Sequence, residues 1–270
     1  MAVNSLTMIT VQRVATSDAL DTLLQSFDGL PNNPASLYLS STAVSLIVYV
    51  APISTVSIIS LPYLIEALLR RERSASALRS LLENGPAIKV FFDARRTAKI
   101  LFDSCAIKLS NPPCTEQAHI HEVQMMELAL RQSDNDREWL AGLDRCIAQD
   151  SDLDIDVHIP ASFGGSKGFN EKILHLPSLW KNYHDCLLMN RNGFGGSFWV
   201  AQIREATQKR LAVSCGETHE GYGVDCAKTA WNRDSIEENT ESWNDDVMMD
   251  HIHHGEILGG AEHWAKLDTL

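Results

Sequence analysis

Five polar side chains stand beside short apolar runs, the positions at which an α/β protein usually carries its active site. Asp93 and Arg95 follow directly after the apolar run 88–92, and His121 and Glu122 stand on a second short run. Tyr183 lies on a later segment with helical spacing. Carboxylate, imidazole and phenol groups can exchange protons with a substrate. We therefore take these five residues as the candidate catalytic groups.

Each of the five has a structural alternative. Asp93 and Arg95 are close enough along the chain to form an ion pair with each other. His121 and Glu122 can flank a strand without taking part in chemistry. Tyr183 can fill a core while its hydroxyl reaches the rim. No nucleophile has a spacing that marks it as paired with a base, so both interpretations stay open.

The segment that carries Asp93 and Arg95 changes period as it passes them. The run 88–92 follows the breaker pair Gly85-Pro86, which predicts a short buried strand. Thr97, Ile100 and Leu101 then recur at helical spacing, and no Gly or Pro interrupts them before Cys105. A strand that turns into a helix near Asp93 is therefore predicted.

The remaining segments predict a mixed α/β architecture. Three β-rich runs precede the strand at 88–92 and are joined by short links, which indicates an antiparallel meander. Their ranges are 36–40, 44–51 and 55–61. Further helices are predicted at 17–27, 63–83, 124–132, 137–148, 177–189 and 198–211, with a strand at 119–123. Periodicity alone supports an α/β fold with a mixed sheet.

Length and composition indicate one main domain with appendages. The chain has 270 residues, of which 44% are hydrophobic. We divide it into an N-terminal helix and linker at 1–34, a main domain at 35–215, and an acidic, partly disordered extension at 216–270. The net charge of −12 makes nucleic acid an improbable partner. Arg70–Arg73 and Arg95-Arg96 are the basic concentrations that run against this.

Cysteine usage and hydropathy favour an intracellular, cytoplasmic protein. Six cysteines show no CxxC pair and no repeated spacing, so reduced thiols are expected rather than disulfides or zinc knuckles. No signal peptide is evident. The most apolar stretch, 43–69, is interrupted by Pro52 and Pro62 and is expected to form sheet rather than a membrane span. A homo-oligomer is left open.

The tail carries a group of histidines whose close spacing is compatible with a metal site. His251, His253 and His254 are two or three residues apart. No Cys or carboxylate motif of known spacing accompanies them. We therefore predict a solvated tail that binds no metal.

Three segments resemble the fungal branch of the DEDD-type 3'-5' exonuclease domains, the ribonuclease D-like group. They are 89–95 (KVFFDAR), 122–129 (EVQMMELA) and 142–147 (GLDRCI). Two further pieces, within 163–172 and at 176–183, fit the same family in the same order, so the resemblance covers about 37–231. It implies a ribonuclease H-like mixed β-sheet flanked by helices. It also implies cleavage of phosphodiesters by two metal ions held by converging carboxylates.

The chain departs from the family at every expected metal ligand. Where the family has Asp-x-Glu on its first strand, this sequence has Ser40 and Thr42, and Thr97 replaces the Asp of the second motif. The third motif belongs between Lys172 and Leu176, where only three residues remain. Neutral hydroxyls do not hold divalent cations at useful affinity. The resemblance therefore predicts a nuclease-inactive protein without metal or other cofactor.

An alternative is that other carboxylates rebuild the site. Asp93, Glu122 and Asp185 are the available groups, but the resemblance does not place them at ligand positions. Without carboxylates the cleft is expected to be more apolar and better suited to a small molecule. The residues expected to line it are Ser40, Ser41, Thr42, Thr97 and Trp180.

Two functions are compatible with such a cleft. The first is a metal-independent enzyme of isomerase, lyase or cyclase type, acting on a small organic substrate. The resemblance suggests a place for it in fungal secondary metabolism. The second is a noncatalytic scaffold, a pseudo-exonuclease that binds RNA or a protein partner.

Overall fold

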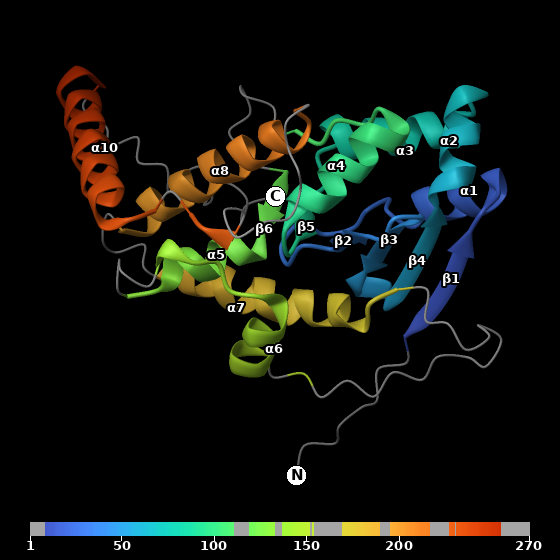
Figure 1. The fold of residues 1–270 in the computed structure, drawn as a ribbon, viewed down its shortest axis with the longest axis horizontal. Helices are drawn as coiled ribbons and strands as arrows, with labels where there is room; N and C mark the ends of the chain where they lie inside the picture. The colour runs from blue at the N-terminus through green and yellow to red at the C-terminus, as the bar shows by residue number, and fades with distance from the viewer. Residues whose placement is uncertain are drawn as a thin grey trace, which may run out of the picture.

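A six-stranded mixed sheet forms the centre of the computed structural model (Figure 1). The structure describes residues 9–110, 119–132, 137–151, 153, 169–189, 195–216, 227–229 and 231–254. The strand order is β1-β4-β3-β2-β5-β6. The strands are β1 (Thr10–Val14), β2 (Leu37–Ser41), β3 (Ser45–Val50), β4 (Thr55–Ser60), β5 (Lys89–Phe91) and β6 (Ile120–Glu122).

The predicted antiparallel meander is confirmed, because β2 pairs with β3 and β3 with β4 in antiparallel register. The other three pairs are parallel, with β1 beside β4, β5 beside β2 and β6 beside β5. The carboxyl ends of β2, β5 and β6 therefore meet at one edge of the sheet. The prediction of an α/β fold with a mixed sheet is also confirmed.

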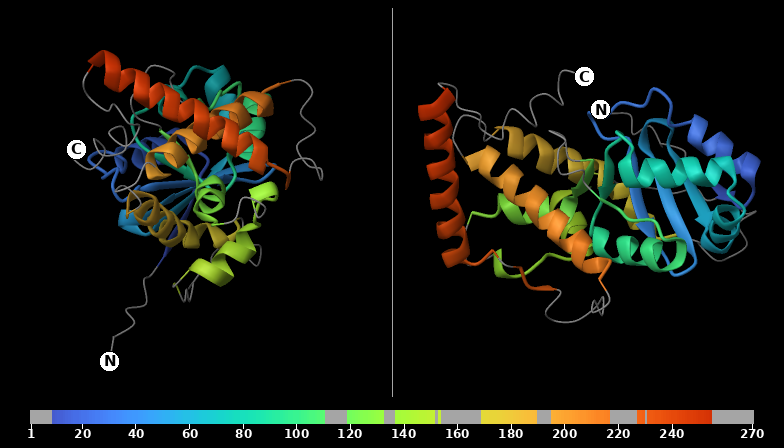
Figure 2. Two further views of the ribbon diagram at one scale, coloured as in Figure 1. Left: turned by 90° about the vertical axis from the view of Figure 1, so that its left-hand side faces the viewer. Right: turned by 90° about the horizontal axis from the view of Figure 1, so that it is seen from above.

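Helices cover both faces of this sheet (Figures 1 and 2). One face carries α1, α2, α3 and α4, which pack on side chains such as Leu39, Leu46 and Phe91. The opposite face carries α5 and α7, which pack on Tyr38 and Val90. The helices on the first face are α1 (Ser17–Gln25), α2 (Leu61–Leu69), α3 (Arg73–Asn84) and α4 (Ala94–Cys105). The later ones are α5 (Val123–Leu130), α6 (Leu143–Asp150), α7 (Leu176–Met189), α8 (Gly195–Ser214) and α10 (Arg233–His254).

The helix predicted at 63–83 is two helices. Arg71 adopts a left-handed conformation with φ of 59° between α2 and α3, and the backbone N–H of Glu72 donates to Ala67 across the break. A side chain with a Cβ pays a steric cost in this region. The apolar residues keep their helical spacing across 63–83, so the break at Arg71 was not predicted from the sequence. The helix predicted at 137–148 likewise begins only at Leu143.

The segment 1–34, predicted as a helix and a linker, also supplies an edge strand. β1 pairs with β4 in parallel register, and its Val11 and Val14 are buried in the cores of opposite faces. The short alternating sequence TVQRV is compatible with such a half-buried strand. The described part of this region therefore joins the central sheet at its edge.

The segment predicted as a loose acidic tail contributes to the core in its described part. Lys228 forms an isolated antiparallel bridge with Trp139, and Trp231 is 5% exposed. α10 follows at the end of the molecule that lies away from β1 (Figure 2). The side chains of His251, His253 and His254 and the motif at 163–166 lie outside the described residues. Across the described residues, no helix is long and apolar enough to cross a membrane.

Candidate active site

Asp93 holds two guanidinium groups at the start of α4. Its side chain caps the helix by accepting a hydrogen bond from the backbone N–H of Arg95 at 3.0 Å. The Arg95 side chain folds back, with Nη2 2.6 Å from Asp93 Oδ2. Arg210, from α8, reaches Asp93 Oδ1 at 3.0 Å. Burial alone would raise the pKa of Asp93, but the hydrogen bonds from Arg95 and the charge of Arg210 outweigh it and hold this pKa below its ordinary value.

Glu122 lies behind this ion pair and is completely buried. Its Oε1 accepts a hydrogen bond of 2.7 Å from the backbone N–H of Ala94, while Oε2 has no hydrogen-bond partner and lies 3.4 Å from Arg210 Nε. Burial raises the pKa of Glu122, and the Asp93 charge adds to this, although Arg210 acts against it. Glu122 and Asp93 are thus two carboxylates whose environments push their pKa values apart.

Arg210 joins α8 to the ends of the sheet strands. Besides its two carboxylate contacts, its Nη2 donates to Gln124 Oε1 at 2.9 Å. Gln124 in turn donates to the backbone oxygen of Ala141 at 2.8 Å. The Arg210 side chain is 14% exposed and is held in place by groups from two separate segments of the chain, at Asp93 and at 122–124.

His121 and Tyr183 do not belong to this cluster. Successive residues of a strand point to opposite faces of the sheet, so His121 points away from Glu122, and its Nδ1 accepts a 3.0 Å hydrogen bond from Trp180 Nε1. Tyr183, on α7, donates to Asp150 Oδ2 at 2.6 Å. Burial, followed by this hydrogen bond to Asp150, raises the pKa of Tyr183. The prediction of one site containing all five residues is therefore corrected to Asp93, Arg95 and Glu122.

The hydroxyl residues meet where the carboxyl end of β2 approaches α4. Ser41 Oγ and Thr97 Oγ1 are 3.0 Å apart. Ser40, one position earlier on β2, points to the other face of the sheet. Thr42 accepts a 3.3 Å hydrogen bond from the backbone N–H of Val44. The structure therefore brings Ser41 to Thr97, rather than Ser40 or Thr42 as the resemblance suggested.

This hydroxyl pair does not fit a pair of divalent cations. Magnesium and manganese sites are built from carboxylate and carbonyl oxygens, whereas Ser41 and Thr97 are neutral and bonded to each other. Among the described residues, no group of three or more His, Cys, Asp or Glu side chains is arranged to hold a metal ion.

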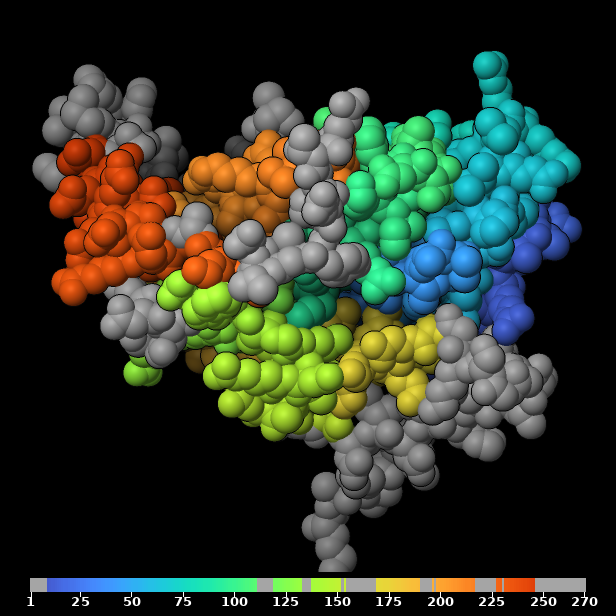
Figure 3. Space-filling view, in the orientation of Figure 1, coloured from blue at the N-terminus to red at the C-terminus, as the bar shows by residue number. Residues whose placement is uncertain are grey.

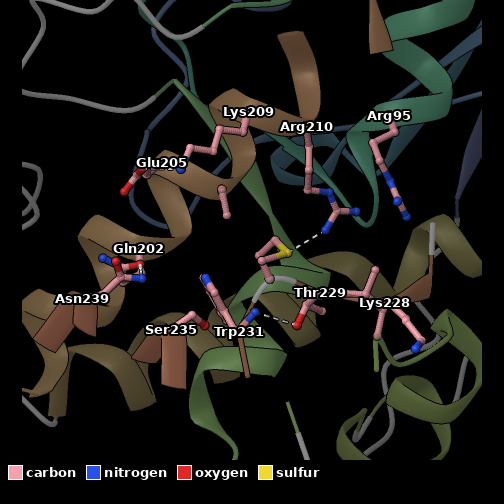
Figure 4. Close-up of a pocket in the computed structure, with 13 residues that line it drawn as sticks. Arg95, Gln202, Glu205, Lys209, Arg210, Lys228, Thr229, Trp231, Ser235 and Asn239 are labelled. Carbon is pink, nitrogen blue, oxygen red and sulfur yellow. Dashed lines mark hydrogen bonds and ion pairs between the residues drawn. The ribbon is translucent and has the colours of Figure 1, made fainter. Parts of the chain in front are cut away.

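A cavity of about 240 Å³ lies beside the ion-paired cluster (Figure 4). Arg210 and Lys209 enter it from α8, Arg95 from α4, and Trp231 from the segment that precedes α10. Lys228 also lines the cavity. Of all the residues predicted to be catalytic or to line the cleft, only Arg95 lines this cavity.

The predicted cleft and the observed cavity lie on different sides of α4. Arg95 and Thr97 are two residues apart on this helix, which places them on opposite sides of it. Thr97 is 3% exposed, and Trp180, at 1%, is a core residue of α7. The hydroxyl groups of Ser40, Ser41, Thr42 and Thr97 therefore do not line the cavity as predicted. Cationic side chains do so instead.

The fold resembles that of solved ribonuclease D structures. Ribonuclease D from Trypanosoma brucei superposes with a TM-score of 0.52 at 15% sequence identity, covering 85% of this chain and 81% of that chain. The chain has a ribonuclease D fold. The Trypanosoma brucei enzyme in complex with RNA U12 gives 0.50 at 14% identity, covering 86% and 79% of the two chains. Ribonuclease D from Escherichia coli gives 0.45 at 11% identity, covering 77% and 51%.

Sequence comparison adds nothing to this likeness, since no protein-family model and no curated protein matches the chain. The ribonuclease D fold confirms the predicted ribonuclease H-like sheet flanked by helices. At such low identity the likeness concerns the fold alone, and the function has to be argued from the side chains of this chain.

Proposed function

We propose that this protein does not cleave nucleic acids by two-metal chemistry and instead acts as a metal-independent enzyme on a small organic substrate. The observation that carries the first half is the Ser41–Thr97 hydroxyl pair, which occupies the junction of β2 and α4. Two divalent cations need several formal negative charges around them, and these two side chains supply none. The second half rests on the cavity lined by Arg95 and Arg210.

The cavity offers electrostatic catalysis rather than strong acid–base catalysis. Fixed cationic donors lower the energy of a transition state in which negative charge develops, because they need no reorganisation during the reaction. Asp93 and Glu122 fix Arg210 in this way from behind, and Asp93 fixes Arg95. In this proposal Arg95 and Arg210 contact the substrate, while the two carboxylates are positioning residues.

The reaction type that fits is a rearrangement, elimination or cyclisation within one bound molecule. Asp93 is held ionised by two guanidinium groups, which makes it a weak base. Glu122 is fully buried and does not line the cavity. Holding one reactive conformer and stabilising its developing charge are the contributions left to the described residues, and both act within a single substrate.

An RNA-binding scaffold is the second candidate, and one observation favours it. Lys209 and Lys228 add to Arg95 and Arg210 around the cavity mouth, and cations of this kind contact phosphates in nucleic-acid complexes. The related fold in Trypanosoma brucei was solved with RNA U12. Such binding would weaken steeply with added salt, whereas binding of a small molecule to a partly apolar cavity would weaken much less.

Incubation of the purified protein with end-labelled RNA in manganese or magnesium tests the proposal. We expect full-length RNA at all times, with an active ribonuclease D shortening the same RNA in parallel. Shortened RNA that disappears on adding a chelator would refute the proposal. Retention of intact RNA at low salt that is lost at moderate salt would favour the scaffold over the enzyme.

A further inference from the structure

The cavity wall is cationic although the protein is strongly acidic. Arg95, Lys209, Arg210 and Lys228 line the cavity and Glu205 is the carboxylate beside them, in a chain of net charge −12. Glu205 is ion-paired with Lys209 at 2.6 Å, so these two charges compensate each other. Lys228 is likewise paired with Glu138 at 3.4 Å. The cationic groups that remain to receive an anion at the cavity surface are therefore the two guanidinium groups.

The carboxylates that balance the guanidinium groups lie behind them. Asp93 contacts both Arg95 and Arg210, yet neither Asp93 nor Glu122 lines the cavity. The two guanidinium groups share the Asp93 carboxylate, and the buried Nε of Arg210 lies 3.4 Å from Glu122 Oε2. Both are thus held close together by one shared anion, which prepares them to bind a second anion from the cavity side.

Across the cavity from Arg210, part of the wall is apolar (Figure 4). Trp231 is fixed by a 3.1 Å hydrogen bond from its backbone N–H to Thr229 Oγ1 and by its contact with Trp199, at 5.3 Å between ring centroids. Met125 and Leu140 continue this apolar surface. The volume of about 240 Å³ lies below the range of roughly 300–1,000 Å³ that holds drug-sized ligands.

We infer that the cavity binds a small organic anion, with a carboxylate or phosphate group held by Arg95 and Arg210 and a flat apolar body lying along Trp231. This inference deepens the proposed function and rests on it in taking the cavity as the substrate site. Guanidinium groups match the planar carboxylate and the phosphate oxygens in two-point contacts. An aromatic face opposite them suits a planar body.

Ser235 provides a variant that changes the charge of the cavity without disturbing its binding groups. It lines the cavity in the first turn of α10, where its N–H donates to the Asn232 cap at 2.9 Å. A carboxylate in the first turn of a helix stabilises that helix, so Ser235→Asp is expected to fold. Ser235→Asn is the matched control, because the Asn side chain has nearly the same shape as that of Asp and carries no charge.

Isothermal titration of the full chain with four probes tests the inference. Cinnamate and phenyl phosphate carry an anionic group on a flat body, cinnamamide carries the body without the charge, and acetate carries the charge without the body. We expect cinnamate or phenyl phosphate to bind, with the better of the two marking the carboxylate or the phosphate as the preferred group. Cinnamamide and acetate should each bind at least about tenfold more weakly than the better anionic probe.

The Ser235 pair locates the binding. Ser235→Asp should weaken binding of the anionic probe about tenfold or more, because it adds a like charge within the cavity. Ser235→Asn should stay within about threefold of the wild type, since no charge is added. Equal binding of cinnamamide and cinnamate would overturn the inferred ligand class while leaving a small-molecule cavity in place. The inference itself would be overturned if Ser235→Asp left the affinity for the anionic probe unchanged, or if no probe bound. The RNA assay judges the absence of nuclease activity separately.

Discussion

The Arg210 guanidinium compensates the fully buried Glu122 and the half-buried Asp93 at once, and this makes it the most sensitive single residue of the cluster. Replacing it by Met would leave Glu122 without a counter-ion and Asp93 with Arg95 alone. Removing one partner of a buried ion pair typically costs about 3–5 kcal/mol. We expect Arg210→Met to lower the free energy of unfolding by about this amount in urea denaturation.

Arg70→Met is the matched control for this substitution. Arg70 lies on the surface just after α2 and is ion-paired with Glu66. The segment of α2 and α3, cyan in Figure 3, lies at the end of the molecule away from α10. An exposed pair of this kind contributes about 1 kcal/mol or less. Equal losses in the two variants would contradict the central role given to Arg210.

At the residue scale, five candidate catalytic groups were predicted from the sequence, and the structure brings three of them together. Asp93, Arg95 and Glu122 stand at strand ends, and that position was the signal. The prediction that His121 and Glu122 share one site was wrong, because adjacent side chains of a strand point to opposite faces of the sheet. Arg210 was missed because its partners lie far away along the chain, and nothing in a helical pattern states which strand end a helix will cover.

At the element scale, Lys89 ties the last turn of α3 to β5. Its side chain is fully buried, and Nζ donates to the carbonyl oxygens of Gly85 at 2.8 Å and Leu81 at 3.2 Å. Burial lowers the pKa of Lys89 to about 8, from an ordinary value of 10.5. Between these pH values the unfolded chain binds more protons at Lys89 than the folded one, so the contribution of Lys89 to stability rises with pH.

This linkage is measurable against Lys89→Met, which shares every other titrating group. The difference in free energy of unfolding between wild type and variant should move in favour of the wild type by roughly 3 kcal/mol from pH 8 to pH 10.5. Urea denaturation across this window gives the value. A difference that stays constant with pH would show that the ammonium group is not desolvated in the folded state.

The segment that precedes α10 is bound to the domain through Trp231. This residue is 5% exposed, and truncating a buried Trp typically costs about 3–5 kcal/mol. Trp139 is 44% exposed and offers a control of the same residue type, for which about 1 kcal/mol or less is expected. We predict this contrast between Trp231→Ala and Trp139→Ala in denaturant unfolding. Similar, small losses would mean that the segment is only loosely attached.

Most elements were predictable because their patterns are local. The meander and the strand-to-helix turn at Asp93 follow from apolar runs bounded by turn residues. The break at Arg71 was not visible, since it depends on one backbone conformation within a continuous helical pattern. β1 was missed because a five-residue edge strand becomes recognisable only through its pairing with β4.

At the scale of the whole molecule, the ribonuclease D fold was reachable from the order of elements and from the resembling segments, while the cavity was not. Its wall is assembled from α4, α5, α8 and the segment around Trp231. These parts are distant in sequence, and composition assigned the last of them to an acidic tail. The net charge of the chain also hid the local excess of cations that defines the cavity.

The central claim is that this fold lacks the negative charge needed to hold two divalent cations at the junction of β2 and α4. Crystals soaked in manganese and measured at the manganese absorption edge test it most directly. We expect no anomalous peak beside Ser41 and Thr97. Two neighbouring peaks within coordination distance of these hydroxyls would contradict it.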